Sequence, residues 1–104
     1  MIIYNVTIHI EKSSEKDFIA WMENEHIPEV LETKNFFKAV FLKVCENENE
    51  TGSTYSCQYF AQNRNNLELY YQENATQLRQ KGKEKFGEKM IAFRTELEVL
   101  KEFI

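Results

Sequence analysis

The stretch Ile2-Ile3-Tyr4-Asn5-Val6-Thr7-Ile8-His9-Ile10 opens the chain with a strict alternation of side chains. Successive side chains of a β-strand point to opposite faces of the sheet. The alternating apolar set falls on one face: Ile2, Tyr4, Val6, Ile8 and Ile10. Asn5, Thr7 and His9 fall on the other. The stretch therefore predicts a strand with one strongly apolar face, against which a layer of helices can pack.

A helix is expected next, beginning at Ser13 or Ser14, because serines are good helix N-caps and acidic residues follow them. Phe18, Met22 and His26 recur at four-residue spacing, which places them on one helix face. Pro28 disfavours helical geometry at the residue before it. We therefore expect a break at His26-Ile27 and a short helical turn over residues 28–32.

The remainder reads as strand, turn, strand, helix and strand. Residues 36–46 are apolar on both faces, 47–53 form a polar turn, and 54–62 return as a strand. Cap residues at 63–66 begin one long second helix that ends at Gly87, and residues 90–99 form the last strand.

The order of elements, β-α-β-β-α-β, predicts an α+β ferredoxin-like fold over residues 1–104 as a single domain. Right-handed crossovers place the first and third strands at the centre of a four-stranded antiparallel sheet, with two helices on one face. A hairpin centred near Thr51 would pair Phe41 with Ala61 and Cys45 with Cys57. A cross-strand disulfide is then conceivable, but we expect two buried, reduced thiols.

The second face of the sheet is too apolar for water. We expect Tyr4, Val6 and Ile8 to face the helices. The open face then combines an apolar and a polar set: Val40, Leu42, Val44 and Phe60 with Asn5, Thr7, His9, Ser56, Gln58, Arg94 and Glu96. Contiguous exposed apolar surface usually marks an interface, so this face predicts a homodimer formed sheet to sheet.

Composition excludes several classes of function. The net charge of −4 argues against nucleic-acid binding, which needs a basic face. No apolar run approaches the roughly 20 residues of a membrane span. The chain starts directly on a strand pattern, which predicts no signal peptide and a cytoplasmic location. The spacing of His and Cys offers no zinc motif, and neither a phosphate-binding loop nor a nucleophile stands out, so no metal or cofactor is expected.

The candidate site residues gather near the end of the first helix. Trp21 and His26, with Tyr4 and Tyr59, would line a pocket between the sheet and that helix. Glu25 and Glu29 lie close to His26 in sequence and would raise its pKa toward neutrality, as a general base requires. The alternative is a structural His26, partly buried and hydrogen-bonded, and this is the role we expect.

A second candidate group lies on the open sheet face. His9, with Arg94 and Glu96 on a neighbouring strand, would bind an acid or an enolate. The alternative is a network of ion pairs and hydrogen bonds at the dimer seam, which we favour because buried charges are usually paired. The basic residues of the second helix alternate with acidic ones and indicate a solvated helix face: Arg79, Lys81, Lys83 and Lys85.

Several motifs together resemble a family of short, uncharacterised bacterial proteins, a domain of unknown function placed with the dimeric α+β barrels. The matching stretches are spread along nearly the whole chain: residues 1–7, 21–22, 25–31, 54–60, 86–87 and 92–98. The resemblance implies a ferredoxin-like protomer and a barrel formed by two facing sheets. It implies no activity.

More distant relatives in that superfamily include quinone-forming and haem-degrading monooxygenases, muconolactone isomerases and EthD-like proteins. The run His26-Ile27-Pro28 is similar to the His-x-Pro that closes the first helix in the EthD-like group. The haem-degrading relatives usually ligate haem from the second helix, which has no His here. Whether the protein is an enzyme therefore stays open. The candidates are a small-molecule binder, a monooxygenase-like or isomerase-like enzyme, and a non-catalytic dimerisation module.

Overall fold

The alternating opening stretch forms β1 (Ile2–Glu11), the strand around which the sheet is built. The computed structural model describes residues 1–45 and 51–104. β1 pairs antiparallel with β3 (Gly52–Ala61) on one side and with β4 (Met90–Glu98) on the other. β2 (Lys38–Lys43) completes the order β2-β3-β1-β4. The predicted ferredoxin-like α+β fold, with the first and third strands central, is confirmed.

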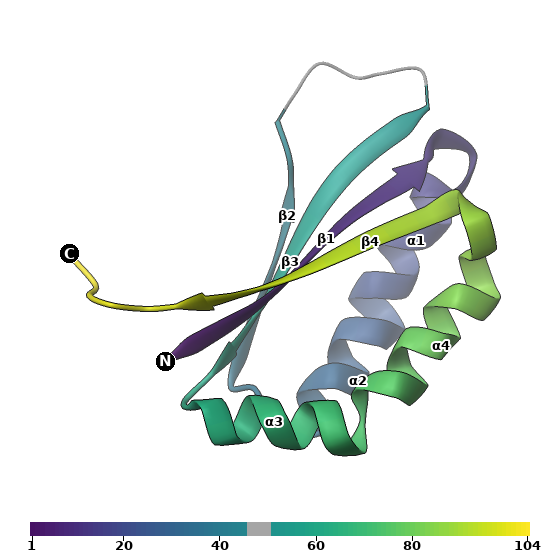
Figure 1. Ribbon diagram of the computed structural model, residues 1–104. Helices are drawn as coiled ribbons and strands as arrows, with labels where there is room; N and C mark the ends of the chain where they lie inside the picture. Colours follow the sequence, from purple (N-terminus) through teal and green to yellow (C-terminus); the bar gives the residue numbers. More distant parts are fainter. Residues whose placement is uncertain (46–50) are drawn as a thin grey trace.

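All the helices cover one face of this sheet (Figure 1). They are α1 (Glu15–Trp21), α2 (Ile27–Glu32), α3 (Arg64–Glu73) and α4 (Ala75–Phe86). The even-numbered residues of β1 are buried beneath them, as predicted, and Ile10 and Phe18 are fully enclosed. The core is rich in aromatic rings, with Tyr4 packed against Phe36, Tyr59 and Tyr70 at centroid separations of 5.7–6.1 Å.

The expected break at His26-Ile27 is wrong. The backbone stays helical through Ile27 (φ −61°, ψ −45°), and a π-helical turn over Met22–His26 joins α1 to α2. In a regular α-helix the ring of Pro28 would clash with the carbonyl of Asn24 one turn earlier. The wider π-turn relieves that clash without ending the helix. Such turns inside helices are frequent at functional sites.

The single second helix that the periodicity predicts is also wrong, because the chain bends at Asn74 (φ −130°, ψ −33°) between α3 and α4. Helical bonding continues across the bend, since Asn74 N–H donates to the Tyr70 carbonyl at 2.9 Å. The Asn74 side-chain oxygen also accepts a bond from Asn35 at 3.5 Å. The bend lets α3 cross one end of the sheet while α4 runs beside β4 (Figure 1).

The hairpin register differs from the expected one. Phe41 lies opposite Cys57, not Ala61, and Lys43 lies opposite Tyr55. β2 ends at Lys43, whereas β3 begins at Gly52; of the expected polar turn, residues 47–50 lie outside the described residues. The shift is even, so the side chains of β2 keep their expected faces.

The two cysteines do not face one another as expected. Cys57 is buried within the ladder, whereas Cys45 is exposed beyond the end of β2, and both are free. The expected pair of buried thiols is therefore wrong for Cys45.

The faces of β4 are the reverse of those expected. Val6 pairs with Arg94 and Tyr4 with Glu96, so these two polar side chains face the helices. Phe93 and its apolar neighbours Ile91 and Leu97 point to the open face instead. β4 is an edge strand that the helices only partly cover, and its polar side chains reach solvent at that rim. The expected group of His9, Arg94 and Glu96 is therefore split between the two faces.

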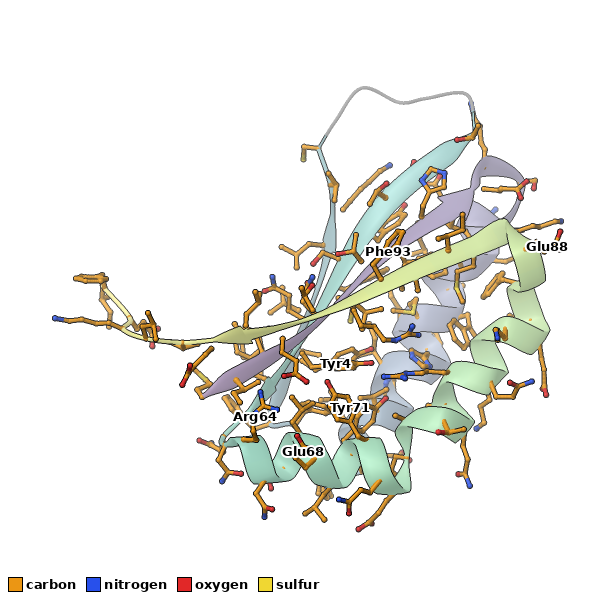
Figure 2. The ribbon with its side chains drawn as sticks, viewed as in Figure 1. Tyr4, Arg64, Glu68, Tyr71, Glu88 and Phe93 are labelled. Atoms are coloured by element: carbon orange, nitrogen blue, oxygen red, sulfur yellow. The ribbon has the colours of Figure 1, made fainter. Side chains whose placement is uncertain are left out.

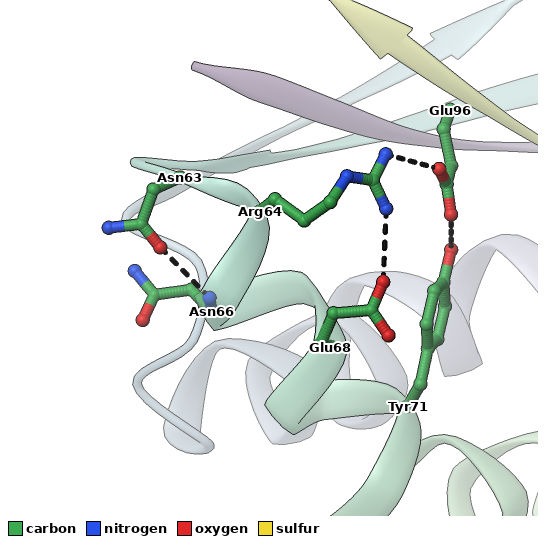
Figure 3. Close-up of polar contacts among 6 residues, drawn as sticks. All are labelled: Asn63, Arg64, Asn66, Glu68, Tyr71 and Glu96. Atoms are coloured by element: carbon green, nitrogen blue, oxygen red, sulfur yellow. Dashed lines mark hydrogen bonds and ion pairs between the residues drawn. The ribbon is translucent and has the colours of Figure 1, made fainter.

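The start of α3 is fixed by the cap that the sequence predicts. The Asn63 side-chain oxygen accepts a hydrogen bond from the backbone N–H of Asn66 at 3.0 Å (Figure 3). Asn63→Ala should lower the free energy of unfolding by about 1 kcal/mol, because one backbone N–H of the first helical turn loses its partner. Urea denaturation of the variant measures this. The matched control is Asn65→Ala, at an exposed position without that bond, and an equal loss there would contradict the assignment.

Candidate functional site

A small cavity of about 40 Å³ lies between the helix-facing side of β1 and β4 and the helices α1 and α4. Tyr4 and Tyr59 reach it from paired positions on β1 and β3, and Trp21 reaches it from the end of α1. Figure 2 shows Tyr4 projecting from the sheet toward Tyr71 and the helix layer, while Phe93 lies on the other side of β4.

Five of the six residues predicted from sequence line this cavity: Tyr4, Trp21, His26, Tyr59 and Arg94. Arg94 lines the cavity because its side of β4 faces the helices, whereas it was expected on the open face. His9 is not part of the group. It lies on the open face, with ring nitrogens 3.3 Å from the hydroxyls of Thr54 and Thr51.

Three buried polar atoms in the described part of the chain lack a hydrogen-bond partner: His26 Nδ1, Tyr59 Oη and Arg79 Nε. All three residues line this one cavity. The thiol of Cys57, on the same strand face as Tyr59, interacts with that hydroxyl, but a thiol is a weak partner. Buried polar groups are normally satisfied, so their convergence on one space marks it as a place for a polar guest.

His26 ends the π-turn, which brings its ring against the core. The ring stacks on Trp21 with centroids 4.5 Å apart and planes 20° apart. Burial lowers the pKa of His26 to about 4, and this outweighs the opposite effect of Glu29. Glu29 is itself paired with Lys81 at 2.6 Å. The expectation that nearby carboxylates raise the pKa of His26 is therefore wrong, and the imidazole is neutral at pH 7.

The expected hydrogen bond of a structural His26 is likewise absent at Nδ1, although the side chain is partly buried as expected. Burial also raises the pKa of the Tyr59 and Tyr70 hydroxyls and raises the pKa of the Cys57 thiol to about 12. These groups stay protonated. The inner end of the cavity is thus lined by neutral groups able to donate and accept hydrogen bonds.

Arg79 is the site residue that sequence reasoning missed. Its guanidinium donates from Nη2 to the Tyr4 hydroxyl at 2.9 Å and lies 5.9 Å from the Tyr71 ring. The interpretation of its helix face as fully solvated is wrong at this position. A signal was present, because residue 79 lies four positions after Ala75 and three before Gly82, on the buried stripe of α4.

Gly82 helps to keep the cavity open. A Cβ atom at this position would lie 3.1 Å from the Met90 methyl carbon and 3.2 Å from the Trp21 ring. Those contacts are tighter than most Cβ contacts, so a side chain here would displace the cavity wall. Glycine in a helix interior costs about 0.5–1 kcal/mol relative to alanine, and here it preserves space.

A wider vestibule of about 360 Å³ adjoins the cavity between α4 and β4. The two spaces share four lining residues: Arg79, Met90, Ala92 and Arg94. Thr76, Gln80 and Lys83 line the outer part. The shared residues therefore form the boundary between the vestibule and the cavity.

The carboxylate closest along β4, Glu96, is engaged elsewhere. It accepts bonds from Arg64 at 2.6 Å and from the Tyr71 hydroxyl at 2.6 Å, and Arg64 also pairs with Glu68 (Figure 3). These contacts lower the pKa of Glu96, so it stays ionised. The described lining of the cavity and the vestibule includes no Asp or Glu.

A larger and more open depression of about 600 Å³ lies between α2 and α4, on the outer side of Trp21. Four carboxylates and two lysines line it, of which Lys81 and Glu29 pair at 2.6 Å, and most of these charged side chains are exposed to solvent. Across residues 1–45 and 51–104, no group of three or more His, Cys, Asp or Glu side chains could hold a metal ion. No helix in the same ranges is long and apolar enough to cross a membrane.

Comparison with known proteins matches residues 1–100 to the model of a domain of unknown function, DUF4286. Two similar crystal structures are dimeric ferredoxin-like proteins from uncultured marine organisms. One has a TM-score of 0.72 at 15% identity, with 98% of this chain and 97% of the other covered. The second has a TM-score of 0.65 at 18% identity, with 100% and 99% covered.

A third similar structure is an ethyl tert-butyl ether d (EthD) family protein from Bacillus halodurans C-125, with a TM-score of 0.68 at 10% identity. It aligns over 94% of this chain and 100% of its own. No curated protein matches the chain. At these identities the structural likeness establishes the ferredoxin-like fold alone.

Proposed function

This chain belongs to the family of the domain of unknown function DUF4286, and we propose that it acts as a homodimer that binds a small molecule in the cavity between its sheet and its helices. Three residues with poorly satisfied buried polar atoms line that cavity, and this carries the proposal: His26 Nδ1 and Arg79 Nε have no partner, and the Tyr59 hydroxyl has only the weak thiol of Cys57. Leaving one such group unsatisfied costs about 1–3 kcal/mol. A bound guest offers the missing partners, which a filled, purely structural core would not need.

The character of His26 favours binding over general base catalysis. A general base works best when its pKa lies near the working pH. The pKa of His26 is about 4, so its imidazole is a weak proton acceptor at pH 7. A neutral ring with one free nitrogen is well suited to hydrogen-bond a ligand. This distinguishes the binding role from the isomerase-like and monooxygenase-like alternatives.

The homodimer is supported by the open face of the sheet. Large apolar side chains are exposed there in the single chain, with Phe93 at 66% and Ile91 at 53%. Monomeric proteins rarely expose contiguous apolar surface of this kind. Two proteins of similar fold are described as dimeric, and a second copy of this chain would cover the face symmetrically.

The binding role is tested through Trp21, the only tryptophan, which lines the cavity. A library of small acids, bases and neutral molecules is screened by tryptophan fluorescence, and native mass spectrometry is run on protein purified from its host. We expect a saturable change in Trp21 emission with some of these compounds, and a small-molecule adduct that denaturation releases.

The matched variants are Ala92→Phe, which plugs the boundary between vestibule and cavity, and Ala20→Phe, on an exposed helix position away from it. Binding should be lost in the first and kept in the second. If no compound of any charge changes Trp21 emission and the purified protein has no adduct, the binding role is wrong.

A further inference from the structure

We propose that the ligand of this cavity is a small carboxylic acid, whose carboxylate is held at the boundary between cavity and vestibule by Arg79 and Arg94. The inference rests on the proposed binding role and adds the chemical class of the ligand. It follows from the distribution of charge along the route, from the hydrogen bonds that Arg79 does and does not make, and from the sizes of the two spaces.

The charge along the route is opposite in sign to that of the whole protein. The chain has 17 acidic against 13 basic residues, yet three basic side chains and no acidic one line the described walls of the two spaces. Lys83 stands in the vestibule, and Arg79 and Arg94 line both spaces. Walls of one charge concentrate ligands of the opposite charge, so an anion is drawn inward along this route.

Neither arginine has a carboxylate partner among the residues that the structure describes. Glu96, which shares their side of β4, is bound by Arg64 and Tyr71. Arg79 is half-buried, and a guanidinium withdrawn from water without a counter-charge is unfavourable. An anionic ligand would supply that counter-charge.

The guanidinium of Arg79 is only partly used by the protein. One nitrogen donates to the Tyr4 hydroxyl, whereas the buried Nε has no partner. Guanidinium groups bind carboxylates through two parallel N–H bonds, which gives both strength and orientation. The Tyr4 bond fixes the plane of the guanidinium and leaves Nε available for such a contact.

The sizes of the two spaces distinguish a carboxylic acid from a bare inorganic anion. The inner cavity, at about 40 Å³, admits a group of one or a few heavy atoms. The vestibule, at about 360 Å³, has room for the body of a small organic molecule beside Met90 and Ala92. Tyr59 and neutral His26 at the inner end would hydrogen-bond a polar substituent of the acid.

The test is a titration of the full-length protein with benzoate, its neutral isostere benzamide and inorganic phosphate, followed by Trp21 fluorescence. We expect saturable binding of benzoate, at least tenfold weaker binding of benzamide, and weaker binding of phosphate. Arg94→Gln alters an exposed side chain, so it should fold normally and weaken benzoate binding at least tenfold. Arg79→Gln should do the same, with its melting temperature measured alongside.

The charge-matched control is Arg64→Gln, whose guanidinium lies outside both spaces and pairs with Glu68 and Glu96. Its benzoate affinity should be unchanged. Equal binding of benzamide and benzoate, tighter binding of phosphate, no benzoate response, or an Arg94→Gln variant with unaltered affinity would each overturn the carboxylic acid class. Whether the cavity binds a ligand of another class would then still be tested by the library screen and the Ala92→Phe variant.

Discussion

Phe93→Asp should convert the proposed homodimer into a monomer. Phe93 stands on the open face of β4, 66% exposed in the single chain, and a second copy of the sheet would bury it. A carboxylate buried there without a partner costs about 3–5 kcal/mol, which raises the dissociation constant of the dimer by about 10²–10⁴-fold. Analytical ultracentrifugation at micromolar concentration measures the change.

The control for that variant is Gln77→Asp, which adds the same charge at an exposed position of α4, away from the open face. It should remain dimeric. Sedimentation of the unmodified protein as a monomer at micromolar concentration would show that the open face has another role.

The polar residues of the open face are arranged so that they could be buried in such an interface at little cost. The Ser56 hydroxyl donates to the side-chain oxygen of Asn5 at 2.7 Å. The amide nitrogen of Asn5 in turn donates to Thr7 at 3.2 Å and to Thr95 at 3.3 Å. Because the Ser56 hydroxyl and the Asn5 amide already have partners within one protomer, covering them leaves these donors paired.

Acidification should destabilise the protein through His26. The folded-state pKa of His26 is about 4, below its ordinary value of 6.5, so the unfolded chain binds a proton more readily. The stabilising effect of a neutral His26 is therefore complete above pH 6.5 and is lost as the pH falls toward 4. Between pH 7.5 and pH 4.5 this amounts to about 2–3 kcal/mol in the free energy of unfolding.

His26→Gln should abolish that component, since Gln does not titrate in this range. Urea denaturation of both proteins at the two pH values gives the difference between their acid-induced losses. Glu29, Lys81 and Arg94 influence the pKa of His26 and are kept unchanged in the comparison. His9→Gln, at the only other histidine, is the matched control and should behave like the unmodified protein. An unchanged acid-induced loss in His26→Gln would place the destabilisation elsewhere.

The order of elements could be predicted because it depends on local signals. The alternation of β1, the Asn63 cap and Gly87 at the end of α4 act within a few residues of where they stand. The helix layer over the apolar face of β1 followed from the same signals. The family resemblance agreed with this order, and the match to DUF4286 covers residues 1–100.

The features that could not be predicted depend on pairing between distant segments. The sequence of β4 alone does not indicate which of its two alternating sets of side chains faces the helices, because neither face of this edge strand is completely covered. The pairing of Val6 with Arg94 places the Arg94 side chain on the helix-facing side of the sheet. The same pairing therefore determines which residues of β4 line the cavity. Arg79 was missed for a related reason. A basic residue on a charged helix is expected to be solvated unless its contacts with the underlying sheet are known, and here the contact is with Tyr4 of β1.

Met90 gives the candidate site a particular kinetic property. Its thioether side chain lines both the vestibule and the inner cavity and lies close to where a Gly82 side chain would project. Methionine is unbranched and has three rotatable bonds, so this wall yields by rotation of one side chain. Rotations of exposed side chains take picoseconds to nanoseconds, and rotation of one partly buried side chain still needs no movement of a loop or a domain. Rotation of Met90 would therefore slow the entry of a ligand between α4 and β4 only slightly. The residence time of the ligand would be set by the contacts that it makes inside the cavity.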